Sequence, residues 1–146
     1  MIEPCLAPHG WRYVGDGWSG WDFEHQDGGR LELKQSTAQQ TWSAPRNLRT
    51  RGTFDIAART GYFYEGGSKY APVPGRCAQT YVFAWNPFFG PGTDHRHTGQ
   101  WEFYVVPANR LPDGQRTIGL SKVRKLAFPV RLAELGSTVS VNRSVP

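Results

Sequence analysis

The chain has 146 residues, a length that fits one domain and is too short for two ordinary ones. Its residues are 38% hydrophobic and 20% charged, which excludes a disordered chain, and no apolar run approaches the roughly 20 residues of a membrane span. The formal net charge is +5, so polyanions such as nucleic acid are candidate partners.

The start of the chain and its cysteines indicate a cytoplasmic protein with no membrane partner. Glu3 and Pro4 follow Met1, where a secretory signal would have basic residues and then an apolar stretch. Cys5 and Cys77 lie far apart and lack the spacing of a zinc site or a disulfide scaffold. We therefore expect two reduced thiols.

Glycines and prolines divide the chain into short elements, which predicts a strand-rich domain with a few helices. We predict strands at 11–14, 21–25, 30–34, 79–85 and 100–106, and helices at 36–42, 121–126 and 129–135. We expect a single α/β (α+β) domain over residues 1–146, with its core at about 11–135 and a tail at about 137–146.

Three features of this division matter below. The run 79–85 is apolar throughout, which is typical of a strand buried on both faces. The last helix is expected to end at Gly136, and the segment from 61 to 75 is expected to be a long loop. Most aromatic residues lie on apolar strand faces and indicate core packing, with base stacking as the weaker alternative.

The strands 21–25 and 30–34 are separated by a glycine-containing turn, which predicts a β-hairpin. A three-residue loop at 27–29 would place Glu24 opposite Glu32. The same register would place Asp22 opposite Lys34. Leu31 would then point to the core, while the charged side chains would share the other face.

Carboxylates on neighbouring strands repel one another unless a positive group lies among them. A divalent metal held by Asp22 and Glu32 would relieve this repulsion, and Lys34 could orient a water or balance charge on a phosphate. The alternative is a solvent-exposed hairpin face of mixed charge, which antiparallel sheets commonly present.

Residues 20–24 (GWDFE), followed by Glu32-Leu33-Lys34, resemble the active-site pattern of the PD-(D/E)xK nuclease superfamily, although Trp21 stands in place of the proline. The segments GWDFE, LELKQS, QQTW and QWEFYVVP also resemble a group of uncharacterised bacterial proteins with that fold, over residues 11–135. The resemblance implies a restriction-endonuclease-like mixed central β-sheet with flanking helices. Only about ten residues precede the first strand, so the N-terminal core helix is expected to be missing or truncated.

The resemblance implies a divalent-metal-dependent phosphodiesterase, an endonuclease acting on DNA. Asp22 and Glu32 would be ligands of Mg²⁺ or Mn²⁺, Lys34 the catalytic lysine and Gln40 a catalytic residue on the following helix. No residue for any other cofactor is expected. Nucleases with this core often act as homodimers, so a homodimer is compatible with the sequence. The alternative function is a catalytically inactive nucleic-acid-binding or partner-binding domain with the same fold.

A basic segment follows the predicted site. Arg46, Arg49 and Arg51 lie within a stretch whose only acidic residue before Arg59 is Asp55. Guanidinium groups bind phosphates through paired hydrogen bonds, so these three arginines are expected to contact the nucleic-acid backbone. A solvated basic loop would give the same pattern.

Overall fold

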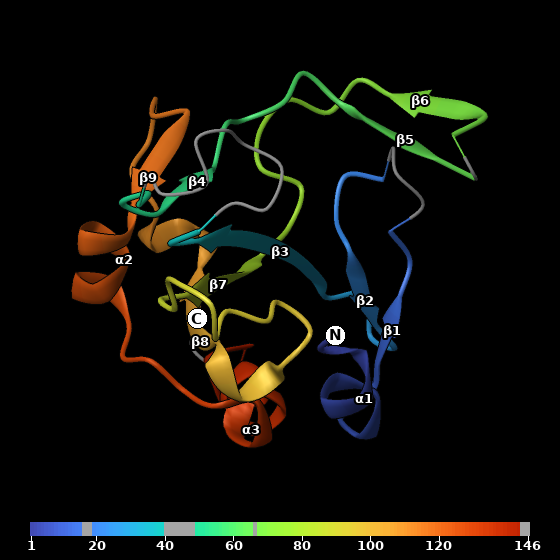
Figure 1. The fold of residues 1–146 in the computed structure, drawn as a ribbon. Coiled ribbons are helices and arrows are strands. Elements are labelled where there is room, and N and C mark those ends of the chain that lie inside the picture. Colours follow the sequence, from blue (N-terminus) through green and yellow to red (C-terminus); the bar gives the residue numbers. More distant parts are fainter. Residues whose placement is uncertain (16–18, 40–48, 66, 144–146) are drawn as a thin grey trace.

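The computed structural model describes residues 1–15, 19–39, 49–65 and 67–143, which form a mixed α+β fold around a five-stranded sheet (Figure 1). In order across the sheet, the strands are β1 (Trp11–Tyr13), β2 (Phe23–His25), β3 (Arg30–Thr37), β7 (Thr80–Asn86) and β8 (Glu102–Pro107). β3 and β7 run parallel, and all other neighbours are antiparallel. The α+β class predicted from the sequence is confirmed.

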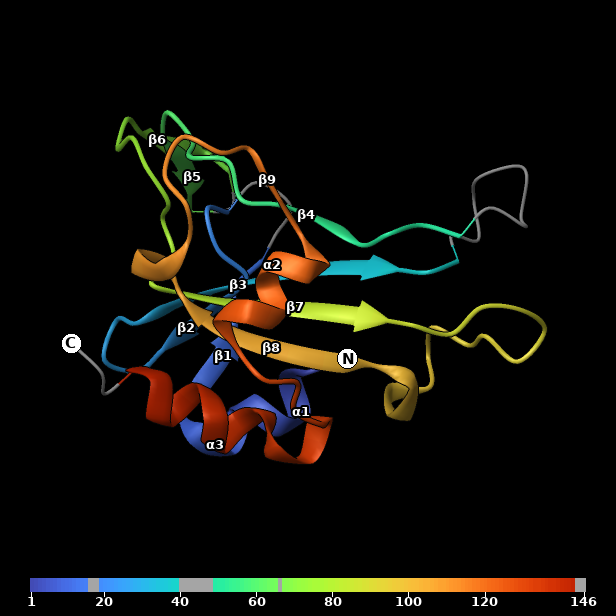
Figure 2. The same ribbon diagram turned by 90° about the vertical axis from the view of Figure 1, so that its left-hand side faces the viewer.

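Both faces of the sheet are covered, as the edge-on view in Figure 2 shows. One face carries the helices α1 (Glu3–Leu6) and α3 (Leu132–Arg143). The other carries α2 (Leu120–Leu126) and a small sheet of β4 (Thr53–Asp55) and β9 (Thr117–Gly119). Each face therefore has a hydrophobic core of its own.

All seven residues of β7 are buried, which confirms the inner strand predicted from its apolar run. Val82 and Ala84 contribute to the core beneath α1 and α3. Phe83 and Trp85 contribute to the core beneath α2 and β4. This division follows from the alternation of side chains along a strand. Because both faces are buried, polar and apolar residues do not alternate in this part of the sequence.

β3 has one apolar face and one polar face, as predicted. Leu31 is fully buried, and Leu33 packs against the same core. Glu32 and Lys34 lie on the opposite face, beside β4. The alternation of the strand therefore places both charged side chains at the border of the second core.

The register predicted for the hairpin is wrong by two residues. Phe23 pairs with Leu31 and Glu24 pairs with Arg30, instead of Glu24 with Glu32. The turn lies one residue earlier than expected, because Gly28 takes the left-handed conformation (φ 88°) and the Asp27 carboxylate accepts a hydrogen bond from the Gly29 amide at 3.1 Å. An even shift keeps Phe23 and Glu24 on their predicted faces but changes their neighbours.

The helix predicted at 36–42 is also wrong for those of its residues that the structure describes. Ser36 and Thr37 extend β3, because they pair with Trp85 and Asn86 of β7. Residues 40–42 lie outside the described ranges. The segment expected to be a loop at 61–75 contains two further strands, β5 (Tyr62–Tyr64) and β6 (Lys69–Ala71). In the described part of the connection from β3 to β7 there is no helix.

The N-terminal end of the chain agrees with the expectation of a short or missing helix, and the C-terminal end differs from the expected tail. At the N-terminal end, α1 has four residues and is followed by a 3₁₀ turn at Ala7–His9. The last helix, by contrast, begins later than predicted and continues through Gly136 to Arg143. Much of the predicted tail is thus helical, and Val139 is fully buried. Within the described ranges, no helix has the length and apolar character needed to span a membrane.

Gly136 continues the helix because α3 packs closely on α1. A Cβ atom at this position would collide with the carbonyl oxygen of Cys5 and the ring of His9. Glycine normally weakens a helix by about 1 kcal/mol relative to alanine, so here close packing outweighs intrinsic propensity.

We expect Gly136→Ala to lower the free energy of unfolding by about 1–3 kcal/mol, because overpacking forces α3 away from α1. Urea denaturation measures this. Ser137→Ala, at the neighbouring exposed position of the same helix, is the control and should change stability by no more than about 0.5 kcal/mol. Stabilisation by Gly136→Ala would show that propensity outweighs the contact.

Candidate functional site

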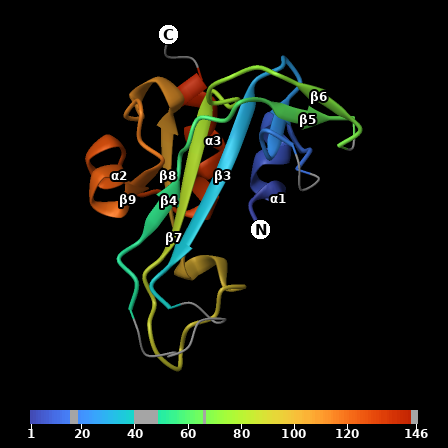
Figure 3. The same cartoon turned by 90° about the horizontal axis from the view of Figure 1, so that it is seen from above.

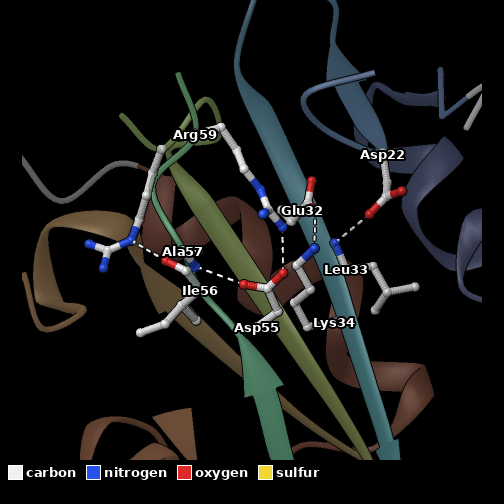
Figure 4. Close-up of polar contacts among 9 residues, drawn as sticks. Asp22, Glu32, Leu33, Lys34, Asp55, Ile56, Ala57 and Arg59 are labelled. Carbon is white, nitrogen blue, oxygen red and sulfur yellow. Dashed lines mark hydrogen bonds and ion pairs between the residues drawn. The ribbon is translucent and has the colours of Figure 1, made fainter. Parts of the chain in front are cut away.

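The polar face of β3 carries an ion pair between Glu32 and Lys34. Both side chains are largely buried, with 16% of Glu32 and 25% of Lys34 exposed. β4 crosses this face and ends at Asp55, whose carboxylate accepts a hydrogen bond from the Ala57 amide at 2.8 Å and pairs with Arg59 (Figure 4). Two acidic and two basic side chains therefore meet between β3 and the end of β4.

A small hollow of about 70 Å³ opens at this cluster. Its polar lining comes from β3, β7 and the connection between them: Glu32, Lys34, Asp55, Arg59, Arg76 and Tyr81. Arg76 holds the rim together, because its Nε donates to the Ile56 carbonyl at 2.9 Å and one Nη to the Pro112 carbonyl at 2.6 Å. Arg76 is thus fixed in place at the rim of the hollow.

Burial raises the pKa of Glu32, and the adjacent ammonium of Lys34 opposes this rise. The Asp22 carboxylate also raises the pKa of Glu32 through charge repulsion, whereas Arg59 lowers it. The pKa of Glu32 therefore depends on charged groups on both sides of β3. These cationic neighbours therefore offset part of the effect of burial on Glu32.

The surroundings of Asp55 and Tyr81 shift the pKa values of these two residues in opposite directions. Although partial burial opposes ionisation of Asp55, its hydrogen bond from Ala57 and the charge of Arg59 lower its pKa overall. Burial and the nearby Glu32 carboxylate raise the pKa of Tyr81 to about 12. Tyr81 lies beside Glu32 in the pairing of β3 with β7, so it presents a protonated hydroxyl group near that carboxylate at neutral pH.

Asp22 does not line this hollow. It lies just before β2, and one of its oxygens accepts a hydrogen bond at 2.7 Å from the backbone amide of Leu33, the residue between Glu32 and Lys34 (Figure 4). Its side chain borders a separate hollow with Tyr13 and Gln35. Asp22 is therefore bound to the backbone of β3 rather than placed opposite Lys34.

The third predicted carboxylate of the hairpin face, Glu24, lies apart from the cluster. It pairs with Arg12 of β1 at 2.9 Å. Gln40 and Arg46 lie outside the described residues. Arg49 and Arg51 are exposed, and Arg49 borders a hollow with Phe88 and Phe89 instead of the hollow at Glu32.

Sequence reasoning missed Asp55, Arg59, Arg76 and Tyr81 as neighbours of Glu32 and Lys34. Asp55 was the single acidic residue in a basic stretch, which is a weak signal. Tyr81 lay in an apolar run that indicated only core packing. The proximity of these residues to β3 results from the crossover between two parallel strands, and no local pattern encodes it.

Within the described residues, no group of three or more His, Cys, Asp or Glu side chains is arranged to hold a metal ion. Mg²⁺ needs only one or two protein carboxylates, because water and substrate phosphate complete its shell. In the described ranges, the hydrogen bonds of Asp22 and Glu32 use one carboxylate oxygen each, Oδ2 and Oε1. The chemistry of these carboxylate oxygens therefore fits a hard divalent cation, while the two side chains border separate hollows.

Comparison with known proteins gives no match: neither a family model, nor a curated protein, nor a solved structure matches this chain.

Replacing Lys34 by methionine should raise the pKa of Glu32 further, because burial would then act without the adjacent ammonium. NMR titration of the side-chain carboxyl groups measures this shift. Lys69→Met, which removes an exposed ammonium paired with Glu65, is the control and should leave Glu32 unchanged. An unchanged or lower pKa of Glu32 in Lys34→Met would contradict the prediction.

The same change should alter the pH dependence of stability. A carboxyl group with a raised pKa binds its proton more tightly in the folded state than in the unfolded chain. The free energy of unfolding of Lys34→Met should therefore fall as pH rises above about 4.3, the ordinary pKa of glutamate. Urea denaturation at several pH values measures this slope, and a slope equal to that of the unmodified protein would contradict it.

Proposed function

We propose that this chain is a divalent-metal-dependent phosphodiesterase, an endonuclease acting on DNA, with a restriction-endonuclease-like core. The strand order supports this fold assignment. β1, β2 and β3 form an antiparallel meander, and β7 then pairs parallel to β3 after a crossover, which is the strand arrangement expected of that core. α1 precedes the meander as a short helix.

One observation carries the functional proposal. Three charged groups converge on a single residue of β3, because Glu32 and Lys34 flank Leu33 and Asp22 binds the Leu33 amide. A structural ion pair alone would not need the second carboxylate, from the residue just before β2. The three groups are those whose spacing resembles the nuclease motif.

Asp22 and Glu32 are the residues that would hold Mg²⁺ or Mn²⁺. When bound, such an ion supplies an activated water molecule and neutralises negative charge on a phosphate. Its charge would also lie beside Glu32, whose ionisation the Asp22 carboxylate disfavours.

The other residues of the cluster act on the substrate directly. The ammonium of Lys34 is positioned to donate a hydrogen bond to a phosphate oxygen and to balance the charge that develops there. Arg59 also lines the hollow, with about half of its side chain exposed, and can contact a second phosphate. Partial burial of Glu32 and Lys34 strengthens these charge interactions relative to those in bulk water.

We expect Asp22→Asn, Glu32→Gln and Lys34→Met each to lower DNA cleavage by at least about 100-fold, because each removes a charge that contacts the ion or the phosphate. Gel assays with Mg²⁺ or Mn²⁺ measure the rate. Glu24→Gln on the same hairpin is the matched control and should cleave normally. Retained cleavage in the folded site variants, or loss in the control, contradicts these roles.

Metal binding should be measurable without turnover. We expect calorimetric titration with Mn²⁺ in the presence of a phosphorothioate-substituted oligonucleotide to detect an ion that Glu32→Gln no longer binds, since one carboxylate ligand is lost. Glu24→Gln should bind like the unmodified protein. Equal binding by all three proteins would place any bound ion elsewhere and favour a nucleic-acid-binding domain without this chemistry.

A further inference from the structure

The β5–β6 hairpin forms an arm that extends beyond the main sheet (Figures 1 and 3). We define the arm as residues 59–65 and 67–75. At its root, Arg59 and Gly75 exchange two backbone hydrogen bonds, of 2.9 and 2.8 Å. Both residues also line the hollow that contains Glu32 and Lys34. The arm therefore begins and ends at the rim of the candidate site.

The base of the arm contacts Trp21, just before β2, and Arg30 of β3. The ring of Tyr62 meets the ring of Trp21 edge to face, with centroids 5.0 Å apart. The guanidinium of Arg30 lies over Trp21 at 3.8 Å. Gly20 permits this contact, because a Cβ there would lie 2.7 Å from the Cβ of Tyr62. A cation and two aromatic rings thus hold the base of the arm in place.

Beyond this base, the arm presents large aromatic rings to solvent. Phe63, Tyr64 and Tyr70 are 39%, 40% and 46% exposed. Phe63 pairs with Tyr70 across the hairpin, so their rings share one face, while Tyr64 lies on the other. These three rings belong to neither hydrophobic core. The exposed part of Tyr64 and Tyr70, 40% and 46% of each residue, contributes to neither hydrophobic core and is available to a binding partner.

The charge near the arm favours one kind of partner. Arg59 at the root and Arg30 at the base are cationic, and the chain carries a net charge of +5. Exposed aromatic rings close to cationic side chains are the elements that bind single-stranded nucleic acid, because bases stack on the rings while phosphates contact the cations. In an intact duplex the bases are already stacked and unavailable.

We infer that the arm stacks on unpaired bases next to the scissile phosphate, so that the substrate is single-stranded DNA or DNA with an unpaired segment. This inference rests on the proposed function, since the site at the root of the arm is taken to bind phosphate. Tyr70 on one face of the hairpin and Tyr64 on the other are the stacking residues, so an unpaired base can lie on either side of the arm. Arg59, which lines the hollow at the root of the arm, is placed to contact the adjoining backbone.

The test measures binding separately from cleavage. Fluorescence anisotropy with a labelled oligothymidylate and a labelled duplex of matched length is recorded in EDTA, where no metal-dependent cleavage occurs. The full chain is compared with the double variant Tyr64→Leu/Tyr70→Leu, which keeps apolar side chains but removes both rings. Phe128→Leu, which alters an 89% exposed ring on the connection between α2 and α3, is the matched control.

We expect the unmodified protein and Phe128→Leu to prefer the single strand, and the double variant to lose about tenfold or more in affinity for it with little change for the duplex. Equal affinity of the unmodified protein for both DNAs, or undiminished single-strand binding by the double variant, would overturn the inference. A changed oligomeric state in the double variant, with DNA binding intact, would assign the arm to protein contacts and also overturn it.

The two proposals fail in different ways. Single-strand binding that depends on the arm, with no DNA cleavage in the presence of Mg²⁺ or Mn²⁺, would refute the proposed function and leave the arm as a binding element. Cleavage that depends on Glu32, with DNA binding unaffected by the arm variants, would support the proposed function and refute the inference that the arm stacks on bases. Because Tyr64 and Tyr70 lie outside both cores, the variants should fold; thermal unfolding checks this, and each single substitution serves if the double variant unfolds.

Discussion

The parallel pairing of β3 with β7 is the interaction on which the rest of the structure depends. Seven residue pairs join the two strands, and β7 is buried along its whole length, so the pairing forms the wall between the two hydrophobic cores. Parallel neighbours cannot be joined by a tight turn, so the chain must travel a long way between them. That connection carries β4, with Asp55 at its end, and then the arm. The candidate site and its neighbours are thus assembled by the crossover.

Sequence patterns predicted those parts of the fold that depend on local periodicity. The apolar run of β7 and the alternation of Leu31 with Glu32 each reflect which face of a strand meets a core, and both predictions are confirmed. The predictions that were wrong concern places where tertiary contacts decide. Ser36 joins β3 because β7 is long enough to pair with it.

The candidate site shows the same division. Glu32 and Lys34 could be found from the sequence because they are two residues apart on one strand. The position of Asp22 could not, since it depends on a turn whose left-handed residue is Gly28 and on a strand that begins only at Phe23. Asp55 reaches the site from another strand, 21 positions after Lys34 along the chain, and only long-range packing brings the two together.

The contact between α1 and α3 has a consequence for how the protein is made. These helices come from opposite ends of the described chain, yet they cover the same face of the sheet, with Leu6 and Leu135 both fully buried there. During synthesis, this core cannot close until the residues of α3 have left the ribosome, whereas β1, β2 and β3 emerge much earlier. The apolar face of the early strands must therefore remain uncovered for most of translation, and a chain interrupted before α3 would expose it to aggregation.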